Sequence, residues 1–217
     1  MAIAYAPSFV TENSGGIATD WPRIPLPASL DVLLGSAEHG KLLAEVLDPL
    51  RPIQTGLLIP SVGSARRVNG GAIRPELGHL EVRAGWGHVQ KDGAVMPARG
   101  KLTSRAFTEA ELAALSGSQG SWGKALDIYL NDGTYWSGVP EPVWEFKIGG
   151  FQVLKKWLSY REFGTEQSGP LGRSLTSDEA RTFSDLARRL AAVVARRTEL
   201  DANYVAVKAD TWAWQNT

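Results

Sequence analysis

Alternation of apolar and polar residues predicts strands in the middle of the chain. Leu126, Ile128 and Leu130 alternate with more polar side chains, as on a strand with one buried face. The turn sequence Asn131-Asp132-Gly133 follows, and the chain returns through Thr134 to Trp136, which predicts a β-hairpin. Residues 57–90 contain short apolar or alternating runs separated by glycines, LLIPSV and HLEVRAGWGHV among them, and Lys-Asp-Gly at 91–93 is typical of another hairpin turn.

A helical period of apolar residues appears before and after these strands. It predicts a helix over about 29–47, with Ser29 as its N-cap and Pro49 ending it. Two further helices begin with capping boxes, formed by Thr108 with Glu111 and by Thr176 with Glu179. The apolar side of the first helix consists of Leu30, Leu33, Leu34, Ala37, Leu43, Val46 and Leu47.

The stretch VWEFKIGGFQVLKKWLSYR, residues 143–161, joins both kinds of pattern. Its β-branched and aromatic beginning predicts a strand over 143–148 that ends at Gly149. The next apolar residues have a helical spacing, so a helix should begin at Phe151 and bury one stripe against the long C-terminal helix. The stripe is Phe151, Leu154, Trp157 and Leu158, and the expected partners are Phe183, Leu186 and Leu190.

The order of these elements predicts an α+β fold, with a mixed, largely antiparallel β region flanked by an N-terminal helix and two C-terminal helices. Residues 1–18 show no clear period and are interpreted as an extended arm or linker remnant. Residues 19–207 are expected to form a single domain, and residues 208–217 a tail.

Composition narrows the class of protein. The 217 residues are 43% hydrophobic and 21% charged, which is typical of a globular domain. The absence of cysteine excludes disulfides, thiolate nucleophiles and cysteine zinc sites. There is no run of 18 apolar residues and no signal-like N-terminus, so we expect no membrane insertion and a cytoplasmic location.

Charge is distributed unevenly along the chain. The net charge is zero, from 23 basic and 23 acidic residues, which argues against binding of nucleic acid by bulk attraction. Residues 61–105 nevertheless hold eight basic and three acidic side chains, whereas residues 106–149 hold two and six. The excess of positive charge is therefore local, and it marks either a binding face or a solvated surface.

Four segments resemble one protein family. They are IGGFQVLKKWLSYR (148–161), the helix start LT-x-x-E (175–179), LDANY (200–204) and DWPRIPLP (20–27). Together they resemble the C-terminal specificity domain of type ISP restriction-modification enzymes, over about residues 20–205. These large polypeptides join a nuclease, a helicase-like motor, an adenine methyltransferase and a target-recognition domain. Residues 61–120 carry no recognisable motif, as suits the part of such a domain that varies with the DNA sequence read.

The resemblance implies a module that recognises a specific sequence in double-stranded DNA and is not itself an enzyme. Its partners would be the methyltransferase and helicase-nuclease domains of a parent enzyme, where S-adenosylmethionine and ATP would bind, with no cofactor in this chain. The residues agree, because the chain has no glycine-rich cofactor loop and no Walker sequence. Asp48-Pro49-Leu50 is the nearest approach to a methyltransferase tetrapeptide and lacks its second proline and aromatic residue.

Candidate DNA-binding residues follow from the basic segment and from the polar side of the helix after Gly150. Arginine can donate two hydrogen bonds to guanine, and Lys, Arg or Gln can bind phosphates. Five of the cations, Arg66, Arg67, Arg99, Lys101 and Arg105, are expected on one positive face. The full set is Arg66, Arg67, Arg74, Arg83, Arg99, Lys101, Arg105, Gln152, Lys155 and Lys156.

Two other classes of function stay open at this point. Trp86 and Trp122 are flanked by glycines, and if exposed they could stack on sugar rings in a carbohydrate-binding module. An enzyme with an unrecognised site is the third reading. The three histidines have no metal-ligand spacing, and the nucleophile motif G-x-S-x-G is missing.

Overall fold

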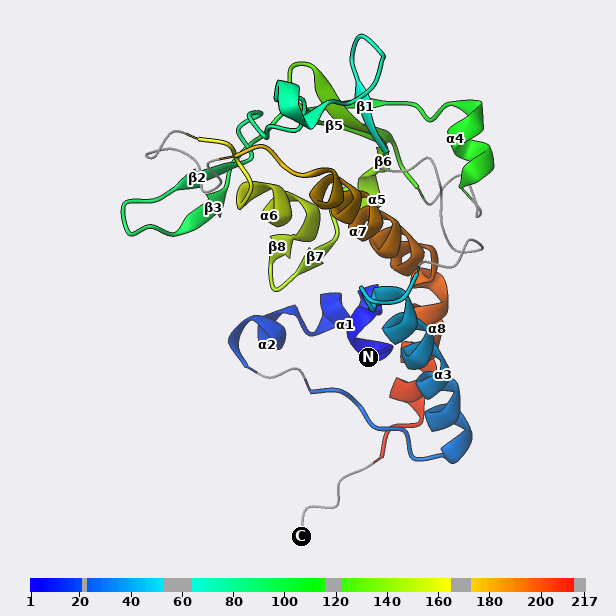
Figure 1. Cartoon of the computed structure of the whole chain (residues 1–217). Helices are drawn as coiled ribbons and strands as arrows, with labels where there is room; N and C mark the ends of the chain where they lie inside the picture. The colour runs from blue at the N-terminus through cyan, green and yellow to red at the C-terminus, as the bar shows by residue number, and fades with distance from the viewer. Residues whose placement is uncertain (21–22, 53–63, 116–121, 165–172, 213–217) are drawn as a thin grey trace. The chain divides into compact units, whose positions relative to one another are not determined.

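The computed structural model describes residues 1–20, 23–52, 64–115, 122–164 and 173–212. Helices and antiparallel strands are both present, which confirms the α+β class (Figure 1). The chain forms two compact units, Met1–Ile53 with Ala192–Thr217, and Gln54–Ala191. The domain boundaries expected from the sequence stay a prediction, since compact units of one chain need not be separate domains.

The first unit is helical. It contains a 3-10 turn at Ile3–Tyr5, α1 (Pro7–Glu12), α2 (Ser14–Thr19), α3 (Leu30–Leu47) and α8 (Arg197–Ala209). The Phe9 ring of α1 is buried and packs edge-on against Tyr204 of α8, with centroids 5.4 Å apart. The expectation of an extended arm over residues 1–18 is therefore wrong, because contacts distant in the sequence stabilise helices too short to show a period.

Helix α3 begins and ends where the sequence predicted. Its N-cap residue Ser29 bonds outside the helix, because its N–H and Oγ donate to the Asp210 carboxylate at 2.8 and 2.7 Å. Leu43 is fully buried, whereas Leu30 and Leu34 are exposed. The apolar side was thus predicted wrongly in its first half, since a period shows which residues share a face but not whether a neighbour covers it.

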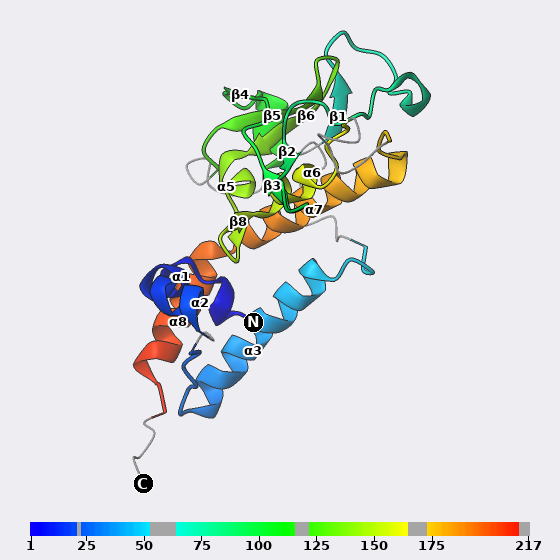
Figure 2. The ribbon, with the colours of Figure 1, turned by 90° about the vertical axis from the view of Figure 1, so that its left-hand side faces the viewer.

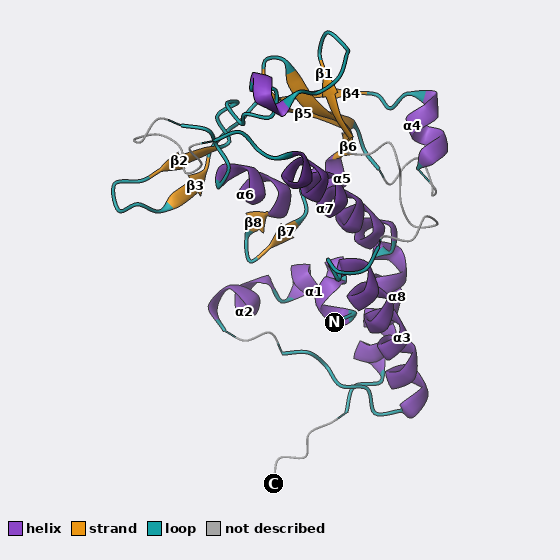
Figure 3. Ribbon diagram, viewed as in Figure 1, coloured by secondary structure: helices purple, strands orange, loops and turns teal. Residues whose placement is uncertain are grey.

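The second unit is built on a four-stranded antiparallel sheet with strand order β1-β6-β5-β4 (Figure 3). Its strands are β1 (Ser64–Arg67), β4 (Leu102–Arg105), β5 (Ala125–Asn131) and β6 (Thr134–Pro140). The β5–β6 hairpin and the turn at 91–93, which joins β2 (Gly87–Val89) to β3 (Val95–Pro97), confirm two predictions. The run at 57–62, predicted as a strand, lies outside the described residues.

The described residues of this unit also form α-helices and a 3-10 turn at Pro75–Leu77. The helices are α4 (Glu109–Ala114), α5 (Glu141–Trp144), α6 (Val153–Ser159) and α7 (Ser177–Ala195), whose last turn enters the first unit. Both capping boxes are confirmed, since Thr108 and Glu111 exchange hydrogen bonds at 2.9 and 3.2 Å, and Thr176 and Glu179 at 2.8 and 3.1 Å.

The core of this unit lies between the sheet and the helices α6 and α7 (Figures 1 and 2). Trp136 of β6 is fully buried, and its ring stacks on Phe183 of α7 with centroids 3.9 Å apart. Trp157 of α6 meets the same phenylalanine edge-on at 5.3 Å. This confirms the predicted packing of Trp157 on the terminal helix, but Phe151 is 44% exposed and does not belong to the buried stripe.

The region before α6 differs from the predicted strand. Pro142 lies in the first turn of α5, which includes Val143 and Trp144, and only Lys147–Ile148 remains extended as β7. β7 pairs with β8 (Phe151–Gln152) across two glycines with φ of 58° and 84°. Consecutive positive φ values characterise a tight hairpin turn, so these glycines reverse the chain instead of joining a strand directly to a helix.

Candidate functional site

The sheet face opposite α6 and α7 carries two tyrosines between two cations. Arg66 of β1 lies opposite Tyr135 of β6, and Tyr135 lies opposite Tyr129 of β5. Opposite residues of antiparallel strands point to the same face. Lys101, next to β4, places its Nζ 4.8 Å from the Tyr129 ring centroid. We name Arg66, Tyr135, Tyr129 and Lys101 the tyrosine ladder.

The two tyrosine side chains are half-buried, so part of each remains accessible to solvent. They stack on each other with centroids 5.4 Å apart and an interplanar angle of 28°. Because β5 lies between β6 and β4, Tyr129 has Tyr135 on one side and Lys101 on the other. Its π faces are thus occupied inside the protein. The accessible part of each half-buried tyrosine remains available to an external partner.

The cation at one end of the ladder has a weak internal partner. Lys101 Nζ donates to Asp132 Oδ1 at 2.7 Å, and this hydrogen bond raises the pKa of Lys101 and lowers that of Asp132. The Asp132 side chain is 97% exposed. Exposed ion pairs contribute little net free energy, so an anion of higher charge density can displace Asp132 from the lysine.

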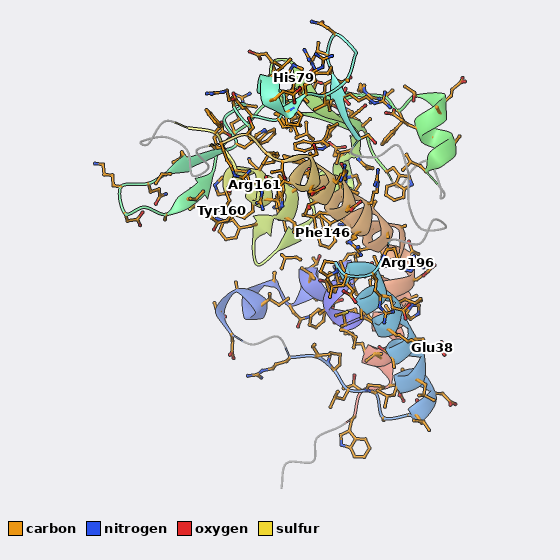
Figure 4. All side chains as sticks on the ribbon, viewed as in Figure 1. Glu38, His79, Phe146, Tyr160, Arg161 and Arg196 are labelled. Atoms are coloured by element: carbon orange, nitrogen blue, oxygen red, sulfur yellow. The ribbon has the colours of Figure 1, made fainter. Side chains whose placement is uncertain are left out.

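Three of the predicted arginines are free to bind a ligand. Arg66, Arg74 and Arg99 are exposed and form no ion pair with any residue that the structure describes. The Nδ1 atom of His79, which is labelled in Figure 4, accepts the main-chain N–H of Arg74 at 2.9 Å. The Nη1 atom of Arg67 lies 2.9 Å from the same nitrogen. Arg67 is half-buried against this histidine.

Arg105 is engaged inside the protein. Its guanidinium donates to both carboxylate oxygens of Glu111 at 2.7 Å, to Asp127 at 2.9 and 3.1 Å, and to Ser137 at 3.1 Å. A further bond runs from Nη1 to the Ala106 carbonyl at 3.1 Å. Hydrogen bonds from Arg105 lower the pKa of Glu111 to about 2. The network fixes α4 at one end of the sheet face.

The expectation that Arg66, Arg67, Arg99, Lys101 and Arg105 lie on one positively charged face is therefore wrong, because two of these cations are paired with acidic residues. Arg105 and Lys101 pair with acidic residues of the segment that follows them. Local counts of charge do not reveal these pairs, because the acids come from β5, from the turn between β5 and β6, and from α4. Whether each residue contacts DNA stays a prediction.

The remaining candidates do not join the ladder. Arg83 pairs with Glu81, and its guanidinium carbon lies 3.9 Å from the Phe163 ring centroid. Lys156 of α6 donates to the Val95 carbonyl at 3.0 Å and lies near the rings of Phe151 and Tyr160, with Tyr160 labelled in Figure 4. Gln152 and the half-buried Lys155 belong to the same region, and α6 covers the inner side of the sheet.

The tryptophans proposed for sugar binding are buried. Trp86 is fully buried, and its Nε1 donates to the Tyr129 carbonyl at 2.7 Å. The Glu162 carboxylate accepts the N–H groups of Gly85 and Trp86 at 2.9 and 2.8 Å, and burial raises its pKa. Trp122 is 2% exposed. The expected exposure of these rings is wrong, which removes the basis of the carbohydrate-binding reading.

Sequence reasoning missed the two tyrosines as site residues. The sequence contained a signal for Tyr129, because this residue alternates with the core residues Ile128 and Leu130 and so lies on the solvent-facing side of the strand. An aromatic residue at a polar position of a strand is a candidate for binding. Which other residues share its face depends on strand register, and this only the structure supplies.

Over the part of the chain that the structure describes, no group of three or more His, Asp or Glu side chains could hold a metal ion. Within the same residues, no helix has the length and apolarity needed to cross a membrane.

Comparison with known protein families finds a match for one segment of the chain. The family model of the type ISP C-terminal specificity domain matches residues 96–189, which confirms the resemblance there. The matched part contains β4, β5, β6 and α4 to α6 complete, and three of the four ladder residues. Searches of curated proteins and of solved structures found no significant match.

Proposed function

We propose that this chain, whose residues 96–189 match the family model of the type ISP C-terminal specificity domain, recognises a short sequence in double-stranded DNA for a restriction-modification enzyme. The family match is the observation that carries the proposal. A specificity domain in such an enzyme must select the DNA target, because the nuclease and methyltransferase chemistry is the same at every site.

The distribution of charge supports binding to a duplex. Arg66, Arg74 and Arg99 are exposed cations within the segment richest in positive charge, while the whole chain has no net charge. A neutral protein with a local basic surface is attracted to phosphates only in the correct orientation. We propose that phosphate contacts hold the module on the duplex and that arginines outside the family match, including Arg66 and Arg74, contribute contacts specific to this protein.

The module acts without catalytic machinery of its own in this proposal. Methyl transfer to adenine and ATP-driven movement belong to the methyltransferase and helicase-nuclease domains of a parent enzyme, which bind S-adenosylmethionine and ATP. These domains and the DNA are its partners, and the cytoplasm is the compartment where they meet. The chain itself supplies a rigid α+β scaffold that presents the DNA-binding surface.

Binding to labelled mixed-sequence duplexes tests the proposal. Fluorescence anisotropy at low and moderate salt should show binding that weakens as salt rises, because each phosphate contact releases a bound counterion. Insoluble polysaccharides serve as the control ligand and should retain none of the protein. Absence of binding to duplex DNA at every salt concentration would contradict the proposal.

A further inference from the structure

We infer that the tyrosine ladder is a binding site for the sugar-phosphate backbone of duplex DNA, an inference that rests on the proposed function. The ladder crosses the whole sheet, with Arg66 at one edge strand and Lys101 at the other. Three strand spacings separate these ends, about 14 Å. Two cations at this separation, with two hydroxyl groups between them, form a linear array suited to a run of phosphates.

The orientation of the rings favours phosphates over stacked bases. An aromatic platform for bases must offer a free π face. Tyr129 has Tyr135 on one side and Lys101 on the other, so it offers no free π face, and Tyr135 uses one of its own faces in the same stack. Tyrosine hydroxyls, together with Arg and Lys, are common donors to phosphate oxygens, which sequence-independent contacts require.

Hydrogen bonds hold the strands of the ladder in place, and its residues are exposed or half-buried. The Arg105 network attaches α4 at the end of the sheet where β4 finishes, through Glu111 and Asp127. Trp86 supports the ladder at Tyr129, because its fully buried indole donates its N–H to the Tyr129 carbonyl. Tyrosine side chains on paired strands above such a core lose little conformational entropy when they bind.

Asp132 gives the site a built-in competitor for phosphate. It bonds Lys101 at 2.7 Å and, being almost fully exposed, lies where a phosphate on this lysine would be. A phosphate on Lys101 is therefore repelled by this carboxylate unless it displaces it. The substitution Asp132→Asn should strengthen binding to all duplexes, an effect opposite in sign to the loss of a ladder cation.

The experiment measures the affinity of the full chain for a labelled mixed-sequence duplex between about 50 and 200 mM salt. Each phosphate contact contributes about 0.9 to the slope of log affinity against log salt. Arg66→Ala and Lys101→Ala should each lower the slope by this amount. Raising the salt from about 50 to about 200 mM should then weaken binding by each variant about 3.5-fold less than it weakens binding by the wild type. The double variant should lose about 12-fold less.

Two further variants separate the ladder from a general charge effect. Tyr135→Phe keeps the ring and removes the hydroxyl, so it should weaken binding about fivefold at every salt concentration, with an unchanged slope. Arg181→Ala removes an equal charge from an exposed position of α7, which covers the opposite side of the sheet, and should change neither quantity. Melting temperatures of all variants, measured in parallel, exclude loss of folding as the cause.

The outcomes distinguish the ladder from the function as a whole. If the wild type binds DNA with a salt-dependent affinity and the Arg66 and Lys101 variants keep its slope, the ladder is not the phosphate site, while the proposed function stands. A wild-type chain that binds no duplex at any salt contradicts the proposed function and the ladder together. Lower slopes for both cation variants, with tighter binding by Asp132→Asn, support the inference.

Discussion

The substitution Gly100→Ala probes the support beneath the tyrosine ladder. Gly100 has φ of +68°, and its N–H donates to the Gly85 carbonyl at 2.8 Å. A Cβ atom at this position would overlap the six-membered ring of Trp86. That ring is fully buried and packs edge-on against Trp144 with centroids 5.1 Å apart, so it has no free space into which to move.

Two penalties add up at this position. A residue with a side chain in the left-handed region costs about 1 to 2 kcal/mol. Forcing an extra carbon into a packed core costs about 1 to 3 kcal/mol more. The free energy of unfolding should therefore fall by about 2 to 5 kcal/mol.

A matched glycine separates the two penalties. Gly93 has φ of +84°, and no atom lies within 4 Å of the Cβ that alanine would add there. Gly93→Ala should show the backbone penalty alone, about 1 to 2 kcal/mol. Urea unfolding followed by tryptophan fluorescence measures both variants. Equal destabilisation of the two would refute the claim that the Trp86 ring is fixed against Gly100.

Three further predictions concern acid stability, the core and catalysis. The pKa of Glu111, lowered from 4.5 to about 2 by Arg105, means that this pair stabilises the fold above pH 4.5 and loses its effect as pH falls toward 2. Glu111→Gln should consequently flatten the fall in melting temperature over that window, and a slope equal to the wild type would contradict the pairing. Trp157→Ala should cost about 3 kcal/mol of unfolding free energy, since the ring packs on Phe183, and an unchanged urea midpoint would place it outside the core. Incubated with DNA and S-adenosylmethionine, the chain should transfer no methyl group, and with ATP it should release no phosphate; methyl incorporation that a substitution within this chain abolishes would overturn this.

Local signals in the sequence predicted local structure well. The capping boxes at Thr108 and Thr176 and the hairpin turn at Asn131 depend on a few neighbouring residues, and all three are present. The segment around Val143 and Trp144 was predicted wrongly, because an apolar run is buried equally well as a strand or as a short helix. Only the packing of the surrounding chain decides between them.

The prediction that tryptophans next to glycines are exposed was wrong. A ring flanked by glycines, such as Trp86, suggested an exposed loop. The structure shows that these glycines allow close packing, since a Cβ on Gly87 would overlap the backbone of Ser159 and one on Gly100 would overlap Trp86 itself. Glycine beside an aromatic residue therefore marks a close approach of chain segments as readily as an exposed turn.

The candidate site was predictable in composition but not in arrangement. The excess of positive charge at residues 61–105 is visible in the sequence. The sequence does not show that Arg105 forms ion pairs with Glu111 and Asp127, whereas Arg66, on the opposite edge strand of the sheet, remains exposed. Pairing between strands distant in the chain decides which cations are available to a ligand.

Selection of bound sequences from a pool of random duplexes tests the central claim most directly. The full chain is mixed with the pool at moderate salt, bound duplexes are recovered over several rounds, and their sequences are compared with the starting pool. Target recognition predicts enrichment of one short sequence, bound more tightly than a shuffled duplex of equal length. Recovery of duplexes that bind but share no sequence would contradict the claim that this chain selects the DNA target.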